Sequence, residues 1–411
     1  MRLPAFDPGS RELSNTKPHI KGTDVRHLQQ ALKWFGLYRG KVDGIFGPET
    51  EMAVRLFQRV YKGKPTGIAD KNFFNILNEL KRGGAGEWIT YRRDFCHTGY
   101  APFRLPDDLK ASKLIKVQEP VGLVAKRNLI FIANKERIEA FDLSKRKVIW
   151  KNEEIKPISI TLTSESILAS AHDLAVVDAI SGKVRVKIDK DTFVSPVAVY
   201  EGVIYAVSTA GTVYALSKEG EIRWYYRTGS DFVTPPAVAG GFVFFGSLSH
   251  VYCLDERGTL CWKTRITELV KEPIAIFENK VFAVTREGSL CALDAETGQI
   301  LWKKSFGEEI LAPCFWKESV VIVTHHGKVL AFNTASGKLM WEKQTGAVPS
   351  TLPFACADSV FIGTDSGLLR LEQGAQKERI YLEGEKINYA IQAKLGLFAI
   401  AGSFLWELSP L

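Results

Sequence analysis

Two adjacent histidines, His325 and His326, are the one histidine pair in the sequence and the first place to look for metal chemistry. They fall at the end of a predicted strand, where neighbouring side chains point to opposite faces of a sheet. Their rings are therefore poorly placed to share one metal ion. We interpret both histidines as exposed surface residues and predict no metal site.

The six cysteines form no metal-binding or dithiol motif either. No CxxC pair is present, which excludes zinc-ribbon and thioredoxin-like sites. Cys253 and Cys261 could face each other across a hairpin and form a disulfide, although small buried thiols are the favoured interpretation. The cysteines do not decide whether the protein occupies a reducing or an oxidising compartment.

Signature motifs of common enzymes are missing as well. The sequence contains no HExxH zinc-protease motif, no GxSxG nucleophile and no Walker loop. The first twenty residues lack the apolar segment of a secretory signal, and no apolar run is long enough to span a membrane. We therefore predict no catalytic residue and no membrane span. Three alternatives stay open: a cytoplasmic location, export by a route that this sequence does not encode, and the loss of a leader from this version of the chain.

The dominant pattern is a repeat with a period of about forty residues, which is the signature of a β-propeller. Its clearest copies read CALDAETGQILW (291–302) and LAFNTASGKLMW (330–341). Each copy contains four strand-like pieces separated by turn residues, as one propeller blade requires. One apolar position marks all the copies, at Phe141, Val177, Leu216, Leu254, Leu293, Phe332, Leu371 and Leu408.

Three further positions recur in most copies: a small residue in the third strand, a tryptophan in the fourth strand, and a glycine in the turn between them. A positive φ is expected at that glycine. A large ring from one blade can lie against the small side chain and exposed peptide of its neighbour, so we interpret the tryptophans as a packing device. The small residues are Ala140, Ala215, Cys253, Ala292 and Ala331, the tryptophans are Trp150, Trp224, Trp262, Trp302 and Trp341, and the glycines are Gly182, Gly220, Gly258, Gly298 and Gly337.

Eight blades are predicted from residues 88–411. The eighth begins near Asn388 and reaches Leu411 without a fourth strand, whereas the segment 111–117 has strand character and lies before the first blade. We expect that segment to supply the missing strand and to close the ring, which leaves no free sheet edge. The other blades are expected to start near Pro120, Ile158, Val197, Pro235, Pro273, Pro313 and Pro353.

The tryptophan pattern resembles the docking motif of quinoprotein-type propellers, and residues 88–102 are similar to the lead-in of PQQ-like repeat proteins. This resemblance covers residues 88–411. It implies a propeller like that of the outer-membrane assembly lipoprotein, which binds no cofactor. The alternative is a quinone-dependent oxidoreductase, but the adjacent cysteines and the calcium-binding cluster of such dehydrogenases are not evident here. We therefore predict no cofactor.

Residues 10–80 carry a different pattern, and residues 81–87 contain a glycine-rich linker. Helical spacing predicts three short helices, which begin after Asp24, at Pro48 and near Asp70. Residues 1–86 contain 15 Lys and Arg against 8 Asp and Glu, a net charge of +7, whereas the remainder has 39 against 38 and carries +1. A basic module favours polyanionic partners.

This module resembles the peptidoglycan-binding domain of bacterial cell-wall hydrolases. The match departs from the family pattern at residues 68–72, where the third helix begins. Most matching residues are expected to be structural, because glycines permit tight turns. The matching residues are Gly22, Asp24, Val25, Leu28, Gln29, Leu32, Gly36, Tyr38, Gly40, Asp43 to Gly47, Thr50, Ala53, Val54, Phe57 and Gln58.

The resemblance also implies a ligand surface beside the DGIFG turn, formed by Tyr38, Arg39, Asp43, Phe46 and Arg55. Aromatic rings would stack on the sugars or on the lactyl-peptide stem, and arginines would pair with carboxylates of the stem peptide. Asp43 is expected to hydrogen-bond amides of the turn. The alternative is that Phe46 belongs to the core and that the arginines are solvated.

These patterns predict a multidomain protein, with a small all-α three-helix peptidoglycan-binding domain followed by an all-β eight-bladed propeller. We interpret it as a non-catalytic, monomeric protein of the cell envelope that binds peptidoglycan rather than nucleic acid. Its propeller would be a scaffold for a protein or glycan partner. The alternatives are a quinone-dependent oxidoreductase and an intracellular protein-interaction propeller.

Overall fold

The computed structural model describes residues 11–34, 38, 40–61, 65–71, 73–74, 77, 96–101, 105, 108–126, 128–163, 165–193, 195–200, 202–239, 241–356, 359–372, 375–393 and 396–410. The chain forms two compact units, the first containing Met1–Gly86 and the second nearly all of Glu87–Leu411. The predicted linker, residues 81–87, lies outside the described residues.

The first unit contains α1 (Thr23–Trp34) and α2 (Pro48–Tyr61). In the first turn of α1, the carboxylate of Asp24 accepts a hydrogen bond from the backbone N–H of Val25 at 2.9 Å. α2 begins at Pro48 as predicted, because the fixed φ of proline suits the first helical position. The buried apolar residues of the two helices include Val25, Leu28, Leu32, Val54 and Phe57.

The third predicted helix of the first unit is described in part. Asp70 Oδ1 accepts a hydrogen bond from the N–H of Phe73 at 2.7 Å, which is the contact of a helix N-cap. Phe73, Phe74 and Leu77 are helical and buried, and the ring centroids of Phe57 and Phe73 are 4.6 Å apart. The helix therefore begins at the predicted place, while its predicted end near Leu80 lies outside the described residues. Within the described ranges, none of the helices combines the length and the hydropathy needed to cross a bilayer.

The second unit is an eight-bladed β-propeller, in which the described residues form eight sheets of four strands each. Blade 1 contains β2 (Pro120–Lys126), β3 (Leu129–Asn134), β4 (Arg137–Asp142) and β5 (Lys147–Asn152); blade 2 contains β6 (Ser159–Leu162), β7 (Ser166–Ser170), β8 (Leu174–Asp178) and β9 (Val184–Ile188). Blade 3 contains β10 (Ala198–Tyr200), β11 (Val203–Val207), β12 (Thr212–Leu216) and β13 (Ile222–Arg227); blade 4 contains β14 (Ala237–Ala239), β15 (Phe242–Gly246), β16 (His250–Leu254) and β17 (Leu260–Arg265).

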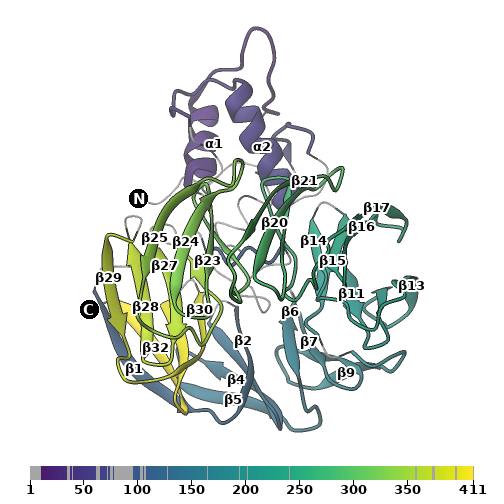
Figure 1. Cartoon of the computed structure of the whole chain (residues 1–411), viewed down its shortest axis with the longest axis vertical. Helices are drawn as coiled ribbons and strands as arrows, with labels where there is room; N and C mark the ends of the chain where they lie inside the picture. Colours follow the sequence, from purple (N-terminus) through teal and green to yellow (C-terminus); the bar gives the residue numbers. More distant parts are fainter. Residues whose placement is uncertain are drawn as a thin grey trace. The chain divides into compact units, whose positions relative to one another are not determined.

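The remaining blades follow the same order. Blade 5 contains β18 (Ala275–Phe277), β19 (Lys280–Val284), β20 (Ser289–Asp294) and β21 (Ile300–Ser305); blade 6 contains β22 (Cys314–Trp316), β23 (Ser319–Val323), β24 (Lys328–Asn333) and β25 (Leu339–Gln344). Blade 7 contains β26 (Phe354–Ala355), β27 (Ser359–Thr364), β28 (Gly367–Glu372) and β29 (Lys377–Tyr381); blade 8 contains β30 (Ile387–Ala393), β31 (Gly396–Ala401), β32 (Phe404–Pro410) and β1 (Leu109–Lys116). Figure 1 shows the blades in chain order around the propeller.

The ring is closed by strands from the two ends of the propeller sequence. β1 pairs with β32 in antiparallel register, for example Ala111 with Leu408, and so becomes the outermost strand of blade 8. β2 contacts both β6 and β30, which places blades 1 and 8 side by side with their first strands toward the centre. The predicted closure by residues 111–117 is therefore confirmed.

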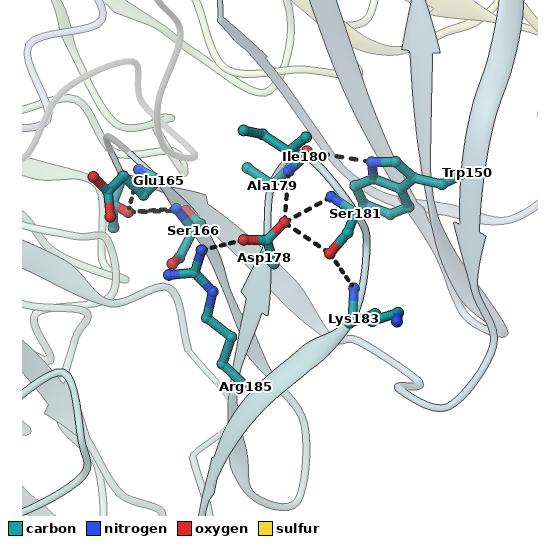
Figure 2. Close-up of polar contacts among 10 residues, drawn as sticks. Trp150, Glu165, Ser166, Asp178, Ala179, Ile180, Ser181, Lys183 and Arg185 are labelled. Carbon is teal, nitrogen blue, oxygen red and sulfur yellow. Dashed lines mark hydrogen bonds and ion pairs between the residues drawn. The ribbon is translucent and has the colours of Figure 1, made fainter.

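The tryptophans join neighbouring blades, as their spacing predicts. Trp150 of blade 1 donates its indole N–H to the carbonyl oxygen of Ala179 in blade 2 at 3.2 Å (Figure 2). A Cβ atom on Gly182, which has a φ of +73°, would lie 2.5 Å from the ring of Trp150. The same indole bond to the next blade recurs from Trp224 to Glu256, from Trp262 to Ala295 and from Trp302 to Thr334.

An aspartate or asparagine holds the turn that receives each of these four rings, namely Asp178, Asp255, Asp294 and Asn333. In blade 2 the carboxylate of Asp178 accepts hydrogen bonds from the N–H groups of Ile180 (3.1 Å) and Ser181 (2.6 Å) and forms an ion pair with Arg185 (Figure 2). These bonds, led by that from the Ser181 amide, lower the pKa of Asp178 to about 2. The turn thus keeps its shape beneath the tryptophan of blade 1.

Cys253 and Cys261 are free thiols in adjacent strands of blade 4. Cys253 is buried as predicted, and burial raises the pKa of its thiol. The prediction was wrong for Cys261, which is exposed. The reason is a shift of register: Cys253 pairs with Trp262 and Leu254 with Leu260, so Cys261 falls at the bulge between them.

Candidate functional site

The DGIFG turn of the helical unit is organised by one buried glutamine on α1. Gln29 accepts a hydrogen bond from the N–H of Gly44 at 2.8 Å. Its amide nitrogen lies 2.9 Å from Asp43 Oδ1 and 3.0 Å from the carbonyl oxygen of Ile45. Gly44 has a φ of +78°, in the left-handed region that favours glycine. A helix side chain therefore fixes both the position and the shape of the turn.

A second turn in the same unit repeats this arrangement. Gln58 on α2 accepts a hydrogen bond from the N–H of Gly67 at 2.8 Å and donates to the carbonyl oxygen of Ile68 at 2.8 Å. Thr66 takes the place that Asp43 holds in the first turn, since its hydroxyl accepts from the N–H of Ile68. The helical unit thus contains two glutamine-locked glycine turns.

The predicted ligand residues divide between structural and accessible positions. Tyr38 is buried, and its hydroxyl donates to the carbonyl oxygen of Lys41 at 2.8 Å. Phe46 is fully buried, so its ring offers no face for stacking on a sugar in this structure. Asp43 bonds the N–H of Ile45 at 2.9 Å, as expected of a turn aspartate. Arg39 lies outside the described residues.

Arg55 is the predicted ligand residue with an accessible charge. Its side chain is 43% exposed and forms an ion pair with Glu51 at 2.7 Å, and a further guanidinium nitrogen donates to the carbonyl oxygen of Pro65. Arg55 therefore lies beside the second glycine turn, whereas Tyr38 and Asp43 belong to the first. The structure brings Tyr38 and Asp43 together around Gln29 and places Arg55 apart from them.

Hydrogen bonding and burial set the charges of this unit. The amide of Gln29, and next the backbone N–H of Ile45, lower the pKa of Asp43 below the usual aspartate value. Burial is the main cause that raises the pKa of Tyr38. Near neutral pH, Asp43 is therefore a carboxylate and Tyr38 a neutral phenol. Neither group is poised to transfer a proton in the physiological range.

A second candidate site lies at the centre of the propeller, where residues 96–101 bind the inner strands of successive blades. The carbonyl oxygen of Cys96 accepts from the N–H of Ile276 at 2.8 Å, and that of Thr98 accepts from Phe315 at 3.1 Å. The carbonyl oxygen of Gly99 accepts from Ala355 at 2.7 Å. This short segment thus crosses β18, β22 and β26 through its main chain.

Next to this segment is a cavity of about 470 Å³. Its wall includes residues of the first strands of blades 1, 2 and 8, together with Gly99 and the loops before β22 and β26. Ser159 on β6 lines the cavity and is 8% exposed, and its hydroxyl has no hydrogen-bond partner among the described residues. The charged residues in the wall include Lys271 and Glu309, whose Nζ and Oε1 atoms are 3.0 Å apart.

This wall does not fit a quinone cofactor with its calcium ion. Pyrroloquinoline quinone is a tricarboxylate, which requires several cationic partners, and calcium requires a group of oxygen ligands. In the cavity wall, Glu309 is already paired with Lys271. The described residues also contain no group of three or more His, Cys, Asp or Glu side chains arranged to hold a metal ion.

His325 and His326 are exposed, as predicted, but they occupy the turn between β23 and β24 rather than the end of a strand. Their ring centroids are 6.0 Å apart and their planes are nearly perpendicular. His326 Nδ1 lies 2.6 Å from the carboxylate of Glu308. His325 lies at the rim of the central cavity.

Gln29 and Gln58 are among the residues that match the family pattern, but their role in holding the two glycine turns was not predicted. The sequence contains a repeated pattern that indicates this role. Each glutamine lies on a predicted helix, and a turn with the dipeptide Gly-Ile follows that helix. Residues 88–102 were recognised as a lead-in to the propeller, but the path of residues 96–101 across its inner strands was not predicted. Residues 96–101 carry no strand-like alternation, since within six residues their main chain bonds to three different blades.

Two family models match the chain. The peptidoglycan binding domain family matches residues 21–77. The family described as outer membrane protein assembly factor BamB matches residues 134–248 and 247–407. The two matches correspond to the helical unit and to most of the propeller.

Individual relatives cover shorter parts of the chain. Outer membrane protein assembly factor BamB of Yersinia pestis is 29% identical over 131 residues, which is 26% of this chain and 33% of the relative. Quinohemoprotein alcohol dehydrogenase ADH-IIG of Pseudomonas putida is 32% identical over 96 residues, 20% of this chain and 13% of the relative. The spore cortex-lytic enzyme of Halalkalibacterium halodurans is 31% identical over 94 residues, 22% of this chain and 28% of the relative. Each match spans about a third or less of the relative's own length.

The fold also matches a solved structure over a longer range. The crystal structure of BamB from Moraxella catarrhalis superposes with a TM-score of 0.60 at 15% identity, covering 73% of this chain and 100% of that chain. At this identity the likeness concerns the fold alone.

Proposed function

Because the chain belongs to the outer membrane protein assembly factor BamB family and also carries a peptidoglycan binding domain, we propose that it is a non-catalytic cell-wall-binding protein. The helical unit attaches the chain to peptidoglycan in the cell envelope. The propeller holds a partner beside the wall. The observation that carries this proposal is the presence of both modules in one chain.

The helical unit recognises peptidoglycan through its arginines. Tyr38, Asp43 and Phe46 hold the first turn in shape, while Arg39 and Arg55 pair with carboxylates of the stem peptide. The guanidinium of Arg55 is 43% exposed, which supports this assignment, because a carboxylate of the stem peptide can replace Glu51 in an exposed ion pair that is worth only about 0–1 kcal/mol. The net charge of +7 on residues 1–86 draws the module toward the anionic polymer.

Co-sedimentation of the full chain with purified sacculi tests this function. We expect the wild-type chain to sediment with the sacculi, and the double variant R39A/R55A to bind about 3- to 10-fold more weakly. The matched control is R223A/R257A, which removes two exposed arginines from the propeller and should leave binding unchanged. A wild-type chain that stays in the supernatant contradicts wall binding. Equal loss in both variants contradicts the assigned surface.

The match to a quinohemoprotein alcohol dehydrogenase favours a second candidate, a quinone-dependent oxidoreductase. Incubating the full chain with pyrroloquinoline quinone, calcium and short-chain alcohols tests it. In the wall of the central cavity, Glu309 is already paired with Lys271. We therefore expect no stable complex, so that the quinone separates from the protein on a desalting column. Alcohol-dependent dye reduction would establish the enzyme and overturn the non-catalytic proposal.

A further inference from the structure

Within the propeller, one segment of the chain, residues 96–101, is already bound across the inner strands of three blades. Strands β18, β22 and β26 each stand first in their sheets, so one edge of each faces the centre. Residues 96–101 bind these edges with main-chain hydrogen bonds, one blade after another. Tyr100 also forms a parallel bridge with Ala355 of β26. Edge strands readily accept such an added segment.

Three other inner strands face the cavity. β2, β6 and β30 also stand at the ends of their sheets and have one strand neighbour each. Residues of all three strands line the cavity, which reaches Gly99 of the bound segment. Residues 96–101 follow the row of inner strand edges across blades 5 to 7. The same row of edges continues along the cavity in blades 8, 1 and 2.

The buried hydroxyl of Ser159 is an independent sign that the cavity receives a ligand. The residue is more than nine-tenths buried, lines the cavity, and has a hydroxyl without a partner among the described residues. A buried polar group that lacks a partner destabilises the fold, because its hydrogen bond to water is lost and not replaced. A ligand that supplies a hydrogen-bonding group beside Ser159 removes this cost.

The chemistry of the wall favours a peptide over a glycan. More than half of its side chains are apolar, and the charges of Lys271 and Glu309 already neutralise each other at 3.0 Å. Sugars need many polar partners, whereas an extended peptide takes its hydrogen bonds from strand edges and places its side chains in apolar pockets. The apolar wall residues include Val121, Leu123, Ile160, Leu311, Phe354 and Ile391.

We propose that the central cavity binds a short, extended, apolar peptide segment of a partner protein, whose main chain bonds to the inner edges of β2, β6 and β30. This proposal deepens the scaffold role of the propeller and rests on that part of the proposed function. It does not depend on wall attachment, because all the residues involved belong to the second unit.

The test uses the full chain and a phage-displayed library of random 12-residue peptides. Peptides selected on the wild-type chain are synthesised, and their Kd is measured by calorimetry. The blocking variant is L311W, which adds bulk at a partly buried position in the wall. The matched control is I300W, which adds the same ring to an exposed position on the outer strand β21. A peptide analogue with alternate main-chain nitrogens methylated, and a soluble disaccharide–tetrapeptide from peptidoglycan, complete the set.

We expect the selected peptides to be apolar, to bind L311W about 10-fold or more weakly, and to bind I300W as tightly as the wild type. Methylation of the main chain should weaken binding to a similar extent, because it removes donors to the strand edges. Equal binding by L311W and wild type, tight binding of the methylated analogue, or displacement by the muropeptide would each overturn the proposal. Sacculus binding by L311W should stay unchanged, which separates this result from a failure of wall attachment.

Discussion

The guanidinium of Arg370 donates a hydrogen bond to the carbonyl oxygen of Leu105 at 3.3 Å, although the two residues are 265 positions apart. Arg370 is fully buried on β28 and lies 2.7 Å from the carboxylate of Glu372. It pairs across the strands with Arg379, which binds the carboxylate of Asp108 at 2.6 Å. Both arginines therefore hold the segment that leads into β1.

This pair replaces the small residue and the tryptophan that occupy the same positions in blades 1, 3, 4, 5 and 6. Ala331 pairs with Trp341 at the same place in blade 6. The exchange has a physical reason, because blade 8 receives its outermost strand from the start of the propeller and has no turn between its third and fourth strands. A tryptophan in blade 7 would find no turn carbonyl to bind, whereas arginines can hold the incoming chain.

Removing the charge of Arg370 should destabilise the propeller strongly. We expect R370M to lower the free energy of unfolding by about 3–5 kcal/mol, because Glu372 would keep a buried carboxylate without its main partner. Urea denaturation followed by tryptophan fluorescence measures the change. The double variant R370M/E372L removes both charges and should recover part of the loss. A double variant that is less stable than R370M would contradict this account.

The architecture of the propeller was predictable because its blades repeat. A period of about forty residues, together with recurring glycines and tryptophans, predicts blades and their joins, and the incomplete eighth copy predicts the closure. Irregular blades were harder to anticipate. Blade 7 uses Arg370 where most other blades have alanine, and the reason lies in Leu105, a residue far away in sequence.

The candidate sites were less predictable than the fold. The resemblance placed the ligand surface beside residues 43–47, but it could not tell that Phe46 is buried or that Arg55 lies next to the other turn. The central cavity had no signal in the sequence. Its wall is assembled from single residues of several blades, such as Ser159, Glu309 and Ile391, so no local pattern marks it.

Replacing Gly182 should weaken the contact between blades 1 and 2. In G182A the methyl group meets the ring of Trp150 at 2.5 Å and the residue keeps a φ of +73°, so we expect a loss of about 2–5 kcal/mol. The control is G229A, because Gly229 has a φ of +72° but no atom within 4 Å of the added methyl group. That variant should lose about 1–2 kcal/mol. Equal losses in urea denaturation would show that the tryptophan contact contributes nothing.

Replacing Gln29 should loosen the helical unit and leave the propeller intact. Q29A removes the acceptor of the Gly44 N–H and the donor to Ile45, so we expect a loss of about 2–4 kcal/mol from that unit alone. Hydrogen exchange of the Gly44 amide should become faster, while amides of β23 keep their protection. Q30A, one residue further along α1, is the matched control. Unchanged exchange at Gly44 in Q29A would contradict the role given to this glutamine.

Acid should destabilise the propeller through its turn aspartates, and Asp178 offers the clearest test. Its pKa in the folded chain is about 2, below the value of about 3.9 expected in an unfolded chain. The ionised carboxylate therefore stabilises the fold above pH 4, and this contribution is lost as the pH falls toward 2.

In D178N the uptake of protons on unfolding between pH 4 and 2 should fall by up to about one proton. Asn333 makes the equivalent turn contacts in blade 6, so the variant should remain folded at neutral pH. Urea denaturation across this pH range measures the slope, and a slope equal to that of the wild type would contradict the assignment.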